Sequence, residues 1–353
     1  MKNTGPHIFD LPKRVVIGGD ILRTLPNIID DLHLGRRVFI VTGPNIRKIV
    51  GEGVASLLSN KNYLVELGTV RSTHIDEVEK IKDEVTAFKP TLIIGLGGGK
   101  SIDTAKYISS KTGIPFISVP TAASHDGIAS PFASIRGIGR VTSAKASPPV
   151  AIIADIKVIA KAPHRLLLAG AGDLIGKLTA VLDWRLAHKL KGDYYGDYAA
   201  SLSLLSAKHV LSFSKIISAG GLNAVRIVIE GLISASVAMC IAGSTRPASG
   251  SEHLFSHALD VVANYPALHG EQVAVGTIMM SYLHGRNWRK IRRIVKNLGL
   301  PTSAKELGVK DVDVVKALTM AHAIRPERYT ILGESGLTWE AAEKLAKITG
   351  VIN

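Results

Sequence analysis

The chain has almost no cysteine and no long hydrophobic run. Its one cysteine, Cys240, excludes an intrachain disulfide framework and a zinc cluster built from cysteines, and is typical of a reducing cytoplasm. The first residues, MKNTGPHIFDLPKR, contain no apolar core of a signal peptide. The best membrane candidate, residues 231–243, is too short to cross a bilayer, and Arg226 and Glu230 precede it closely. We therefore expect a buried helix there, no membrane insertion and a cytoplasmic protein.

Acidic and aromatic residues are also scarce. The chain has 29 Asp and Glu against 43 Lys and Arg, a formal net charge of +14, and 5% aromatic residues. A nucleic-acid-binding protein would concentrate its positive charge beside aromatic side chains. The one dense basic run, residues 284–296, is typical of the solvated face of an amphipathic helix. We therefore expect no nucleic-acid partner, although a positive protein also attracts anionic substrates and phosphates.

The first 160 residues alternate short β-branched runs with stretches of helical spacing. Continuous apolar strands separated by helices indicate a parallel sheet that is covered on both faces. This part of the chain is therefore predicted to be a doubly wound, Rossmann-like α/β domain. The expected strands are residues 36–43, 63–67, 91–99, 115–121 and 150–156, and the expected helices between them are 46–59, 75–88 and 101–111.

After Pro163 helical periodicity dominates to the C-terminus, and no convincing strand appears. The predicted fold is therefore an α/β domain over residues 1–160 and an all-α domain over residues 161–353. The cleft between two such domains is the default place for an active site. Apolar helical stretches such as 222–242 leave room for an interface between copies of the chain, so we expect a homo-oligomer.

A glycine-rich turn, GLGGGKSID (95–103), joins the third expected strand to its helix. A Walker A motif would need glycine in place of Ile94, and the G-x-G-x-x-G fingerprint would need it in place of Lys100, so the turn matches neither. Three glycines without Cβ atoms nevertheless let the backbone approach a pyrophosphate closely, and a helix starting near Ser101 favours an anion at its N-terminus. The alternative is a tight turn without a ligand, for which one glycine would suffice.

The next expected strand ends in a loop of small and hydroxyl residues, VPTAASHDGIASPFAS (119–134). It should emerge beside the glycine-rich turn, because neighbouring parallel strands end at the same edge of a sheet. Thr121, Ser124 and Ser130 can then reach a cofactor by hydrogen bonds, and Asp126 can bind a substrate hydroxyl. Small polar residues are common in loops of every kind, so this pattern alone does not establish a site.

Three histidines stand close together in SEHLFSHALDVVANYPALHGE (251–271). His253 and His257 share one face of an expected helix, His269 begins another, and Asp173 is expected in the first turn of a third. One Asp and two His from three helices would make a three-ligand site with an open position, which is the pattern of catalytic zinc. Histidine pairs at this spacing also arise by chance, and the alternative is a set of core or surface residues without a metal.

Several motifs together make the chain resemble the archaeal-type sn-glycerol-1-phosphate dehydrogenases. These belong to the superfamily of iron-dependent alcohol dehydrogenases, glycerol dehydrogenases and dehydroquinate synthases. The resemblance runs from about residue 8 to the C-terminus, and SHDGIASPFAS and SGSEHLFSHALD are the blocks specific to this branch. The other motifs that carry it are GLGGGKSIDTAKY, AIIADI, AGAGDLIGK, DWRLA, YYGDY and LHGEQVAVG.

The resemblance implies a dehydroquinate synthase-like fold and a role for each candidate residue. It implies Asp173, His253 and His269 as ligands of one Zn²⁺ per subunit, although this donor set suits several divalent metals. It implies that Asp126, His257 and Asp173 touch the substrate, with Asp126 and His257 as catalytic groups. The residues implied to hold NAD(H) or NADP(H) are Gly97, Gly98, Gly99, Lys100, Ser101, Val119, Pro120, Thr121, Ala122 and Ser130.

Relatives with four metal ligands carry a histidine four residues after the aspartate, where this chain has Lys177. A protonated ammonium is a poor ligand, so three protein ligands and open coordination sites are expected. His257, one helical turn from His253, would bind the substrate or relay a proton, and a purely supporting role is the alternative. The cations for a substrate phosphate stay open, with Lys177, Lys145 and Arg226 as candidates.

The implied reaction is the NAD(P)H-dependent reduction of dihydroxyacetone phosphate to sn-glycerol 1-phosphate. This product is the backbone of archaeal ether lipids, and its handedness follows from the resemblance alone. A glycerol dehydrogenase or another polyol dehydrogenase would have the same metal site without a phosphate pocket. A dehydroquinate synthase would recycle NAD, and net turnover of NAD(H) would exclude it.

Use of both cofactors is predicted from the end of the first expected strand. Many nucleotide-binding domains carry an acid there that accepts the ribose hydroxyl and repels a 2′-phosphate. This chain has Thr42-Gly43-Pro44, with Arg47 and Lys48 close behind and no acid. Steady-state kinetics should therefore give roughly equal catalytic efficiencies with NAD(H) and NADP(H), and a strong preference for NAD(H) would contradict the prediction.

Overall fold

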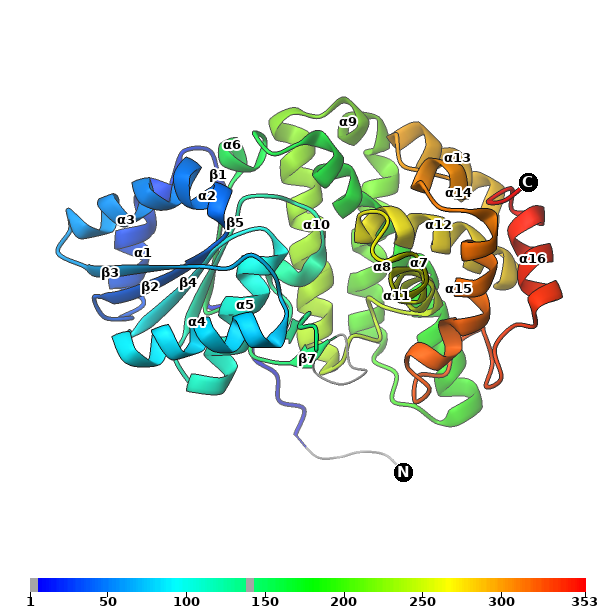
Figure 1. The fold of residues 1–353 in the computed structure, drawn as a ribbon, viewed down its shortest axis with the longest axis horizontal. Coiled ribbons are helices and arrows are strands. Elements are labelled where there is room, and N and C mark those ends of the chain that lie inside the picture. Colours follow the sequence, from blue (N-terminus) through cyan, green and yellow to red (C-terminus); the bar gives the residue numbers. More distant parts are fainter. Residues whose placement is uncertain (1–5, 138–142) are drawn as a thin grey trace.

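Six parallel strands form one sheet in the N-terminal part of the chain (Figure 1). The computed structural model describes residues 6–137 and 143–353. The sheet has the order β1-β8-β5-β4-β2-β3, so the chain leaves β2 first to one side and then to the other. The strands are β1 (Arg14–Gly18), β2 (Arg37–Thr42), β3 (Leu64–Thr69), β4 (Leu92–Gly97), β5 (Phe116–Pro120) and β8 (Ala151–Asp155).

Helices cover both faces of this sheet because its central strands are apolar on both sides. Val38 and Ile40 of β2 belong to a core with α1 (Leu25–Asp31) and α3 (Glu52–Ser59). Phe39, the residue between them, points to the other face. The helices on that face are α4 (Ile75–Phe88) and α5 (Gly99–Thr112). The prediction of a doubly wound, parallel α/β fold is confirmed.

The structure adds elements that the sequence pattern did not indicate. β1 (Arg14–Gly18) pairs with β8 at the edge of the sheet. The stretch expected as one helix over 46–59 is divided into α2 (Pro44–Ile46), a wider turn over Arg47–Gly51 and α3. A small antiparallel pair, β6 (Phe132–Ala133) and β7 (Ala144–Lys145), follows the loop after β5.

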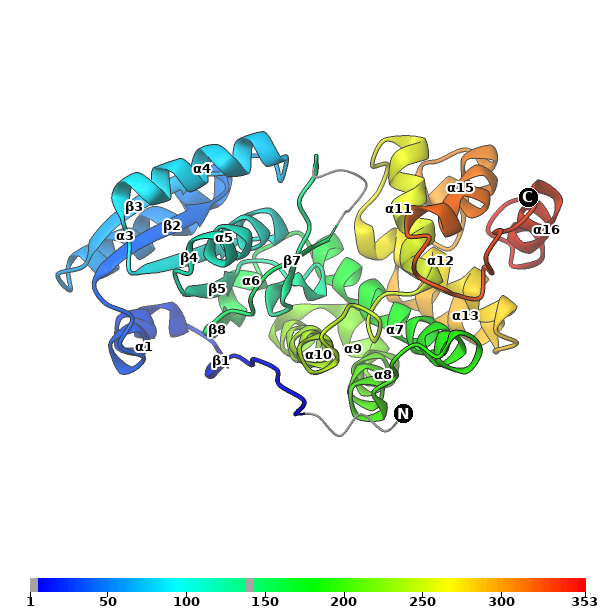
Figure 2. The same ribbon diagram turned by 90° about the horizontal axis from the view of Figure 1, so that it is seen from below.

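From His164 onward the described chain is helical, as predicted (Figure 2). The change comes after β8 and the short α6 (Ile156–Ile159), near the boundary expected at residue 160; that boundary stays a prediction. The helices are α7 (His164–Lys191), α8 (Asp197–Ser212), α9 (Ser214–Ala219), α10 (Gly221–Ala242), α11 (Ser251–Ala263), α12 (His269–Leu283), α13 (Trp288–Leu298), α14 (Ala304–Leu307), α15 (Asp311–Ile324) and α16 (Trp339–Ile348).

Helix α10 contains the stretch that is most apolar in the sequence. By length and composition alone it could cross a membrane, but 72% of its most apolar window is buried inside the protein. It packs against α7 and α8, which confirms the expectation of a buried helix. Because the chain covers most of this helix itself, little apolar surface remains there for a second copy.

Helices α7 and α12 cross so closely that their backbones touch. A Cβ atom on Gly270 would lie 1.8 Å from the carbonyl oxygen of Ala169, and one on Gly172 would lie 2.3 Å from the carbonyl oxygen of Gly270. Asp173 and His269 are the chain neighbours of these two glycines. Because these glycines have no side chain, the two helices can approach closely, and this brings two of the predicted metal ligands, Asp173 and His269, together. Asp173 lies in the middle of α7 and not, as expected, in a first turn.

Substitution Gly270→Ala tests this contact. The added methyl group must push α12 away from α7, so the free energy of unfolding should fall by about 1–3 kcal/mol, as in other overpacked cores. Thermal unfolding of the full chain measures the effect. Gly53→Ala is the matched control because its Cβ would meet no atom within 4 Å in helix α3. Equal thermal stability of the two variants would show that the close approach is not a constraint.

Candidate active site

One large cavity, of about 950 Å³, lies between the carboxyl edge of the sheet and the helices. Gly43, after β2, and Gly98, after β4, line it from the sheet side. The strand order reverses between these two strands, and such switch points are where doubly wound sheets bind their ligands. His253, His257 and His269 line it from the helical side. The cavity therefore brings the two candidate sites of the sequence into one space.

The glycine-rich turn has the shape expected of a phosphate-binding turn. Gly97 has φ +150°, and a Cβ atom there would lie 2.6 Å from the hydroxyl oxygen of Ser101. A Cβ atom on Gly98 would meet nothing within 4 Å, so this side of the turn is open. Helix α5 begins directly afterwards, at Gly99 rather than at Ser101, and its first N–H groups favour an anion.

The predicted cofactor residues divide into two groups. Those in the first group line the cavity, whereas those in the second lie behind it in or next to β4 and β5. The backbone N–H of Thr121 donates to the carbonyl oxygen of Gly97 at 3.0 Å, so the second group ties the two loops together. The lining residues are Gly98, Gly99, Lys100, Ser101, Ala122 and Ser130, and those behind are Gly97, Val119, Pro120 and Thr121.

A buried lysine that the sequence analysis missed holds the second loop in place. Lys106 of α5 has no exposed surface, and its ammonium donates to the carbonyl oxygens of Gly127 at 2.6 Å and Phe132 at 2.7 Å. It also lies 3.1 Å from Asp103 Oδ1 and 3.4 Å from the hydroxyl of Ser130. Buried lysines are rare unless paired. The sequence did contain a signal for this burial, because Lys106 stands four residues after Ile102 and therefore shares an apolar face of the helix.

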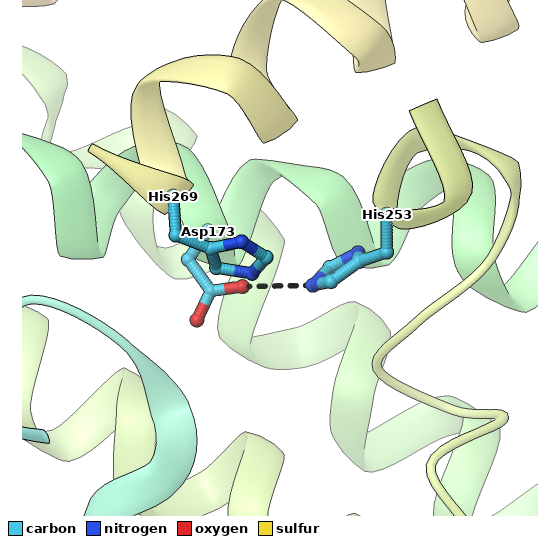
Figure 3. A group of neighbouring side chains, drawn as sticks. All are labelled: Asp173, His253 and His269. Atoms are coloured by element: carbon cyan, nitrogen blue, oxygen red, sulfur yellow. Dashed lines mark ion pairs between the residues drawn. The ribbon is translucent and has the colours of Figure 1, made fainter. Parts of the chain in front are cut away.

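Asp173, His253 and His269 converge from three different helices (Figure 3). One candidate ligand atom of each residue lies within 4.8 Å of the other two, and Asp173 Oδ1 lies 3.3 Å from His253 Nε2. The helices are α7, α11 and α12. The three residues that were separate in the sequence therefore form one cluster of potential ligands, and its occupation by a metal stays a prediction.

Hydrogen bonds to side chains behind the cluster orient both of its imidazole rings. His253 Nδ1 lies 2.7 Å from Glu252 Oε1, which leaves Nε2 toward Asp173. His269 Nδ1 lies 3.1 Å from the hydroxyl of Ser256. Each histidine therefore has one nitrogen engaged behind the site and one available in front of it, as metal-binding histidines usually do.

Asp173 is fully buried, and both of its carboxylate oxygens are engaged. Oδ1 accepts from the ammonium of Lys177 at 2.7 Å, and Oδ2 accepts from the backbone N–H of Asp126 at 2.9 Å. The same ammonium lies 2.6 Å from Asp126 Oδ2 and donates to the carbonyl oxygen of Ala248 at 3.1 Å. Burial alone would raise the pKa of Asp173, but the Lys177 charge and the hydrogen bond with His253 hold it well below its usual value.

Burial and neighbouring charges set the protonation of the histidines. Burial would lower the pKa of His253, but its hydrogen bonds to Asp173 and Glu252 raise it overall. Burial lowers the pKa of His269 to about 3, and the charge of His253 adds to this effect. Burial also holds the pKa of His257 well below its ordinary value. At neutral pH His257 and His269 are therefore neutral, the state in which an imidazole nitrogen accepts a metal or a proton.

His257 and Asp126 complete the set and reach the cavity. The ring of His257 stacks on that of His269, with centroids 5.6 Å apart and planes 25° apart. Both His257 and Asp126 line the cavity, close to the cluster, whereas Asp173 lies beneath its surface. A ligand in the cavity can therefore touch one carboxylate and two or three imidazoles at once.

The donor chemistry of the cluster fits a divalent metal. One carboxylate and two imidazoles are the ligand types of catalytic zinc, and all three offer an atom to the same point. The two carboxylates of Asp126 and Asp173 share a single ammonium, that of Lys177. These three side chains together therefore carry one excess negative charge, which favours a cation beside them.

The chain is similar to known proteins over almost its entire length. The family model described as iron-containing alcohol dehydrogenase matches residues 16–163. A protein of Hyperthermus butylicus named glycerol-1-phosphate dehydrogenase [NAD(P)+] is 56% identical over 350 residues, which cover 98% of this chain and 99% of the relative. A protein of Pyrococcus abyssi with the same name is 55% identical over 98% of this chain and 100% of the relative.

Solved structures with the same fold are more distant in sequence. A probable glycerol dehydrogenase from Sinorhizobium meliloti has a TM-score of 0.80 at 21% identity, and the match covers 99% of this chain and 100% of that one. Glycerol dehydrogenase from Schizosaccharomyces pombe has a TM-score of 0.79 at 19% identity, covering 98% and 91%. At these identities the likeness supports the fold alone.

Substitution Lys106→Met tests the role of the buried lysine. It leaves the carboxylate of Asp103 uncompensated and two carbonyl oxygens without their donor, so the free energy of unfolding should fall by about 3–5 kcal/mol. Chemical denaturation measures this. Lys111→Met, at an exposed position of the same helix, is the control and should change stability by less than about 0.5 kcal/mol. Equal effects of both substitutions would contradict the assignment.

Proposed function

Because the chain belongs to the glycerol-1-phosphate dehydrogenases, a family of NAD(P)-dependent oxidoreductases, we propose that it reduces dihydroxyacetone phosphate to sn-glycerol 1-phosphate. The observation that carries this proposal is the convergence of Asp173, His253 and His269 beside a glycine-rich turn in one cavity. A metal cluster and an anion-binding turn in a common space are what a metal-assisted hydride transfer to a carbonyl needs.

We assign Zn²⁺ to the cluster of Asp173, His253 and His269. When bound, a divalent metal supplies a positive charge that polarises the substrate carbonyl and stabilises the negative charge developing on its oxygen. Three protein ligands leave coordination positions for the substrate. Lys177 stands where a fourth ligand would be, and its ammonium, held between two carboxylates, keeps that position closed to a metal.

The remaining polar groups position the substrate and handle its proton. Asp126 faces the cavity with a carboxylate that Lys177 holds in place, so it can accept a hydrogen bond from a substrate hydroxyl. His257 is neutral and lies against His269, so it can hydrogen-bond the substrate oxygen or take part in the transfer of its proton. Since the carbonyl oxygen gains a proton in the reduction, a neutral imidazole next to it is the candidate relay.

NAD(H) or NADP(H) is assigned to the sheet side of the cavity. The turn of Gly98 to Ser101 and the N-terminus of α5 would hold the pyrophosphate, and Ala122 and Ser130 would flank the nicotinamide. The reduced nicotinamide supplies the hydride. At the end of β2 the cavity is lined by Gly43, Pro44 and Asn45, without an acid among these residues, which supports use of both cofactors.

The product would supply the glycerol backbone of archaeal ether lipids. The protein would then act in the cytoplasm as a homo-oligomer, with no nucleic acid as partner and no membrane insertion. The burial of α10 supports the last point. The dense basic run at 284–296 contributes to the surface helix α13, which supports the interpretation of its charge as a solvated face.

Chelation tests the metal and the reaction together. Oxidation of NADH or NADPH at 340 nm with dihydroxyacetone phosphate should be abolished by a chelator and restored by Zn²⁺. His253→Ala should lower the turnover about 100-fold or more, because loss of a ligand costs at least as much as loss of its outer-shell support. His209→Ala, at a partly buried position of α8 that does not line the cavity, is the control.

Two results would contradict the proposal. Full activity after exhaustive chelation would show that the reaction does not require a metal. Comparable catalytic efficiencies with glycerol and glycerol phosphate in the reverse assay would favour a glycerol dehydrogenase. The two enantiomers of glycerol phosphate, assayed separately in that direction, test the handedness.

A further inference from the structure

Helices α11 and α12 face each other through a group of polar side chains behind the metal cluster. On α11, Ser256 and Asp260 stand four residues apart. On α12, His269 and Gln272 stand three apart, so each pair shares one face of its helix. The two helices pack against each other, and Ser256 and Gln272 have no exposed surface. Polar groups buried this deeply bond to one another, and these bonds decide where each proton lies.

The bonds form one continuous series that starts at His269. Its Nδ1 lies 3.1 Å from the hydroxyl oxygen of Ser256. The same hydroxyl lies 2.9 Å from Oε1 of Gln272. The amide nitrogen of Gln272, Nε2, donates to Asp260 Oδ1 at 2.9 Å and to the carbonyl oxygen of Ala267 at 3.1 Å. The series thus runs from the metal cluster to the loop between α11 and α12.

The far end of this series fixes the orientation of the Gln272 amide. A backbone carbonyl can only accept, so the amide group that faces Ala267 must be the NH₂ group. With the amide reversed, its oxygen would face the carbonyl oxygen of Ala267 and the carboxyl group of Asp260, and two buried hydrogen bonds would be lost. Because the Ala267 carbonyl accepts in every protonation state of Asp260, this orientation does not depend on that carboxyl group. Oε1 of Gln272 is therefore held toward Ser256.

The amide oxygen in turn fixes the direction of the Ser256 proton. An amide oxygen carries no proton, so Ser256 must donate to it. A hydroxyl has one proton, and a Ser256 that has donated it can only accept from His269. Nδ1 of His269 must then carry a proton, and the other nitrogen of the neutral imidazole, Nε2, has the free lone pair. A metal in the cluster needs that lone pair.

His253 obtains the same tautomer more directly. Its Nδ1 lies 2.7 Å from Oε1 of Glu252, and the other oxygen of that carboxylate accepts from the hydroxyl of Thr179 at 2.7 Å. An ionised carboxylate can only accept, so it needs no further partner to set the proton on Nδ1. His269 instead has a hydroxyl behind it, which can donate or accept. Gln272 is the residue that restricts this hydroxyl to one of the two roles.

We infer that Gln272 is a positioning residue of the metal site: through Ser256 it fixes the tautomer of His269, with the proton on Nδ1 and the lone pair of Nε2 available to the metal. This inference rests on the proposed function and deepens it. Neither Gln272 nor Ser256 lines the cavity, so both act through His269 and not on the substrate.

The position of the proton can be measured on the wild-type protein without metal. Long-range proton–nitrogen NMR correlation spectra of protein labelled with ¹⁵N-histidine show which ring nitrogen carries the proton. The signals of His269 are those that are missing in His269→Gln. The expected result is a proton on Nδ1. A proton on Nε2, or an even mixture of the two tautomers, would overturn the inference.

Gln272→Met is the test variant, because methionine has a similar length but only a weak acceptor for the Ser256 proton. Ser256 can then donate to Nδ1, which places the His269 proton on Nε2 in part of the molecules. Zn²⁺ affinity, measured by competition with a chromogenic chelator, should fall about 10- to 100-fold, as for other residues that orient a metal ligand. Gln272→Glu should recover part of the affinity, since a carboxyl group again offers an acceptor.

Thr277→Val is the matched control on the same helix. Thr277 is also fully buried, but its hydroxyl donates to the carbonyl oxygen of Val273 and takes no part in the series. This variant should keep the Zn²⁺ affinity and the His269 tautomer of the wild type. An equal loss of affinity in Gln272→Met and Thr277→Val would show that Gln272 only stabilises α12, and the inference would fail.

Ser256→Ala keeps the inference testable if Gln272→Met does not fold. It removes the acceptor of the Nδ1 proton while Gln272 stays in place, so the Zn²⁺ affinity should fall and the two tautomers of His269 should mix. An unchanged affinity and an unchanged tautomer would contradict the inference. If the wild type does not reduce dihydroxyacetone phosphate, the proposed function fails, and the spectra of the metal-free protein still decide the tautomer.

Discussion

Two carboxylates that share one buried ammonium are the constraint on which the site depends. Asp126 and Asp173 both contact Lys177, and removal of this ammonium would leave two uncompensated carboxylates side by side. These three side chains carry a net negative charge, and a divalent cation would reverse its sign. The site would then attract an anionic substrate. The same ammonium donates to the carbonyl oxygen of Ala248 and so anchors the loop between α10 and α11.

The fold brings these groups together from distant parts of the chain. Gly172 and Gly270 let α7 and α12 touch, which brings Asp173 to His269. The backbone N–H of Asp126, which follows the sheet strand β5, donates to Asp173 in the helical part. This bond ties the two parts of the protein together at the site itself. Lys106 performs the corresponding task behind the loop, where it fixes Gly127 and Phe132.

Local pattern was sufficient to predict the parallel sheet and most helices, since continuous apolar strands and helical spacing are local signals. It missed β1, whose five residues become a strand only through pairing with β8, 137 residues later in register. The metal cluster could be proposed from the sequence because only a few residue types can act as metal ligands. The role of Lys106 was not, because a lysine in a sequence is normally a surface charge. Only the neighbours supplied by the tertiary fold show that this side chain is fully buried.

The most direct test of the central claim is the position of a bound metal. X-ray anomalous diffraction at the zinc edge, on crystals of the full-length protein loaded with Zn²⁺, measures that position without reference to activity. The account predicts one strong peak between the carboxylate of Asp173 and the imidazoles of His253 and His269, with Lys177 outside the coordination shell. A peak elsewhere in the molecule, or none at the cluster at full zinc loading, would contradict it.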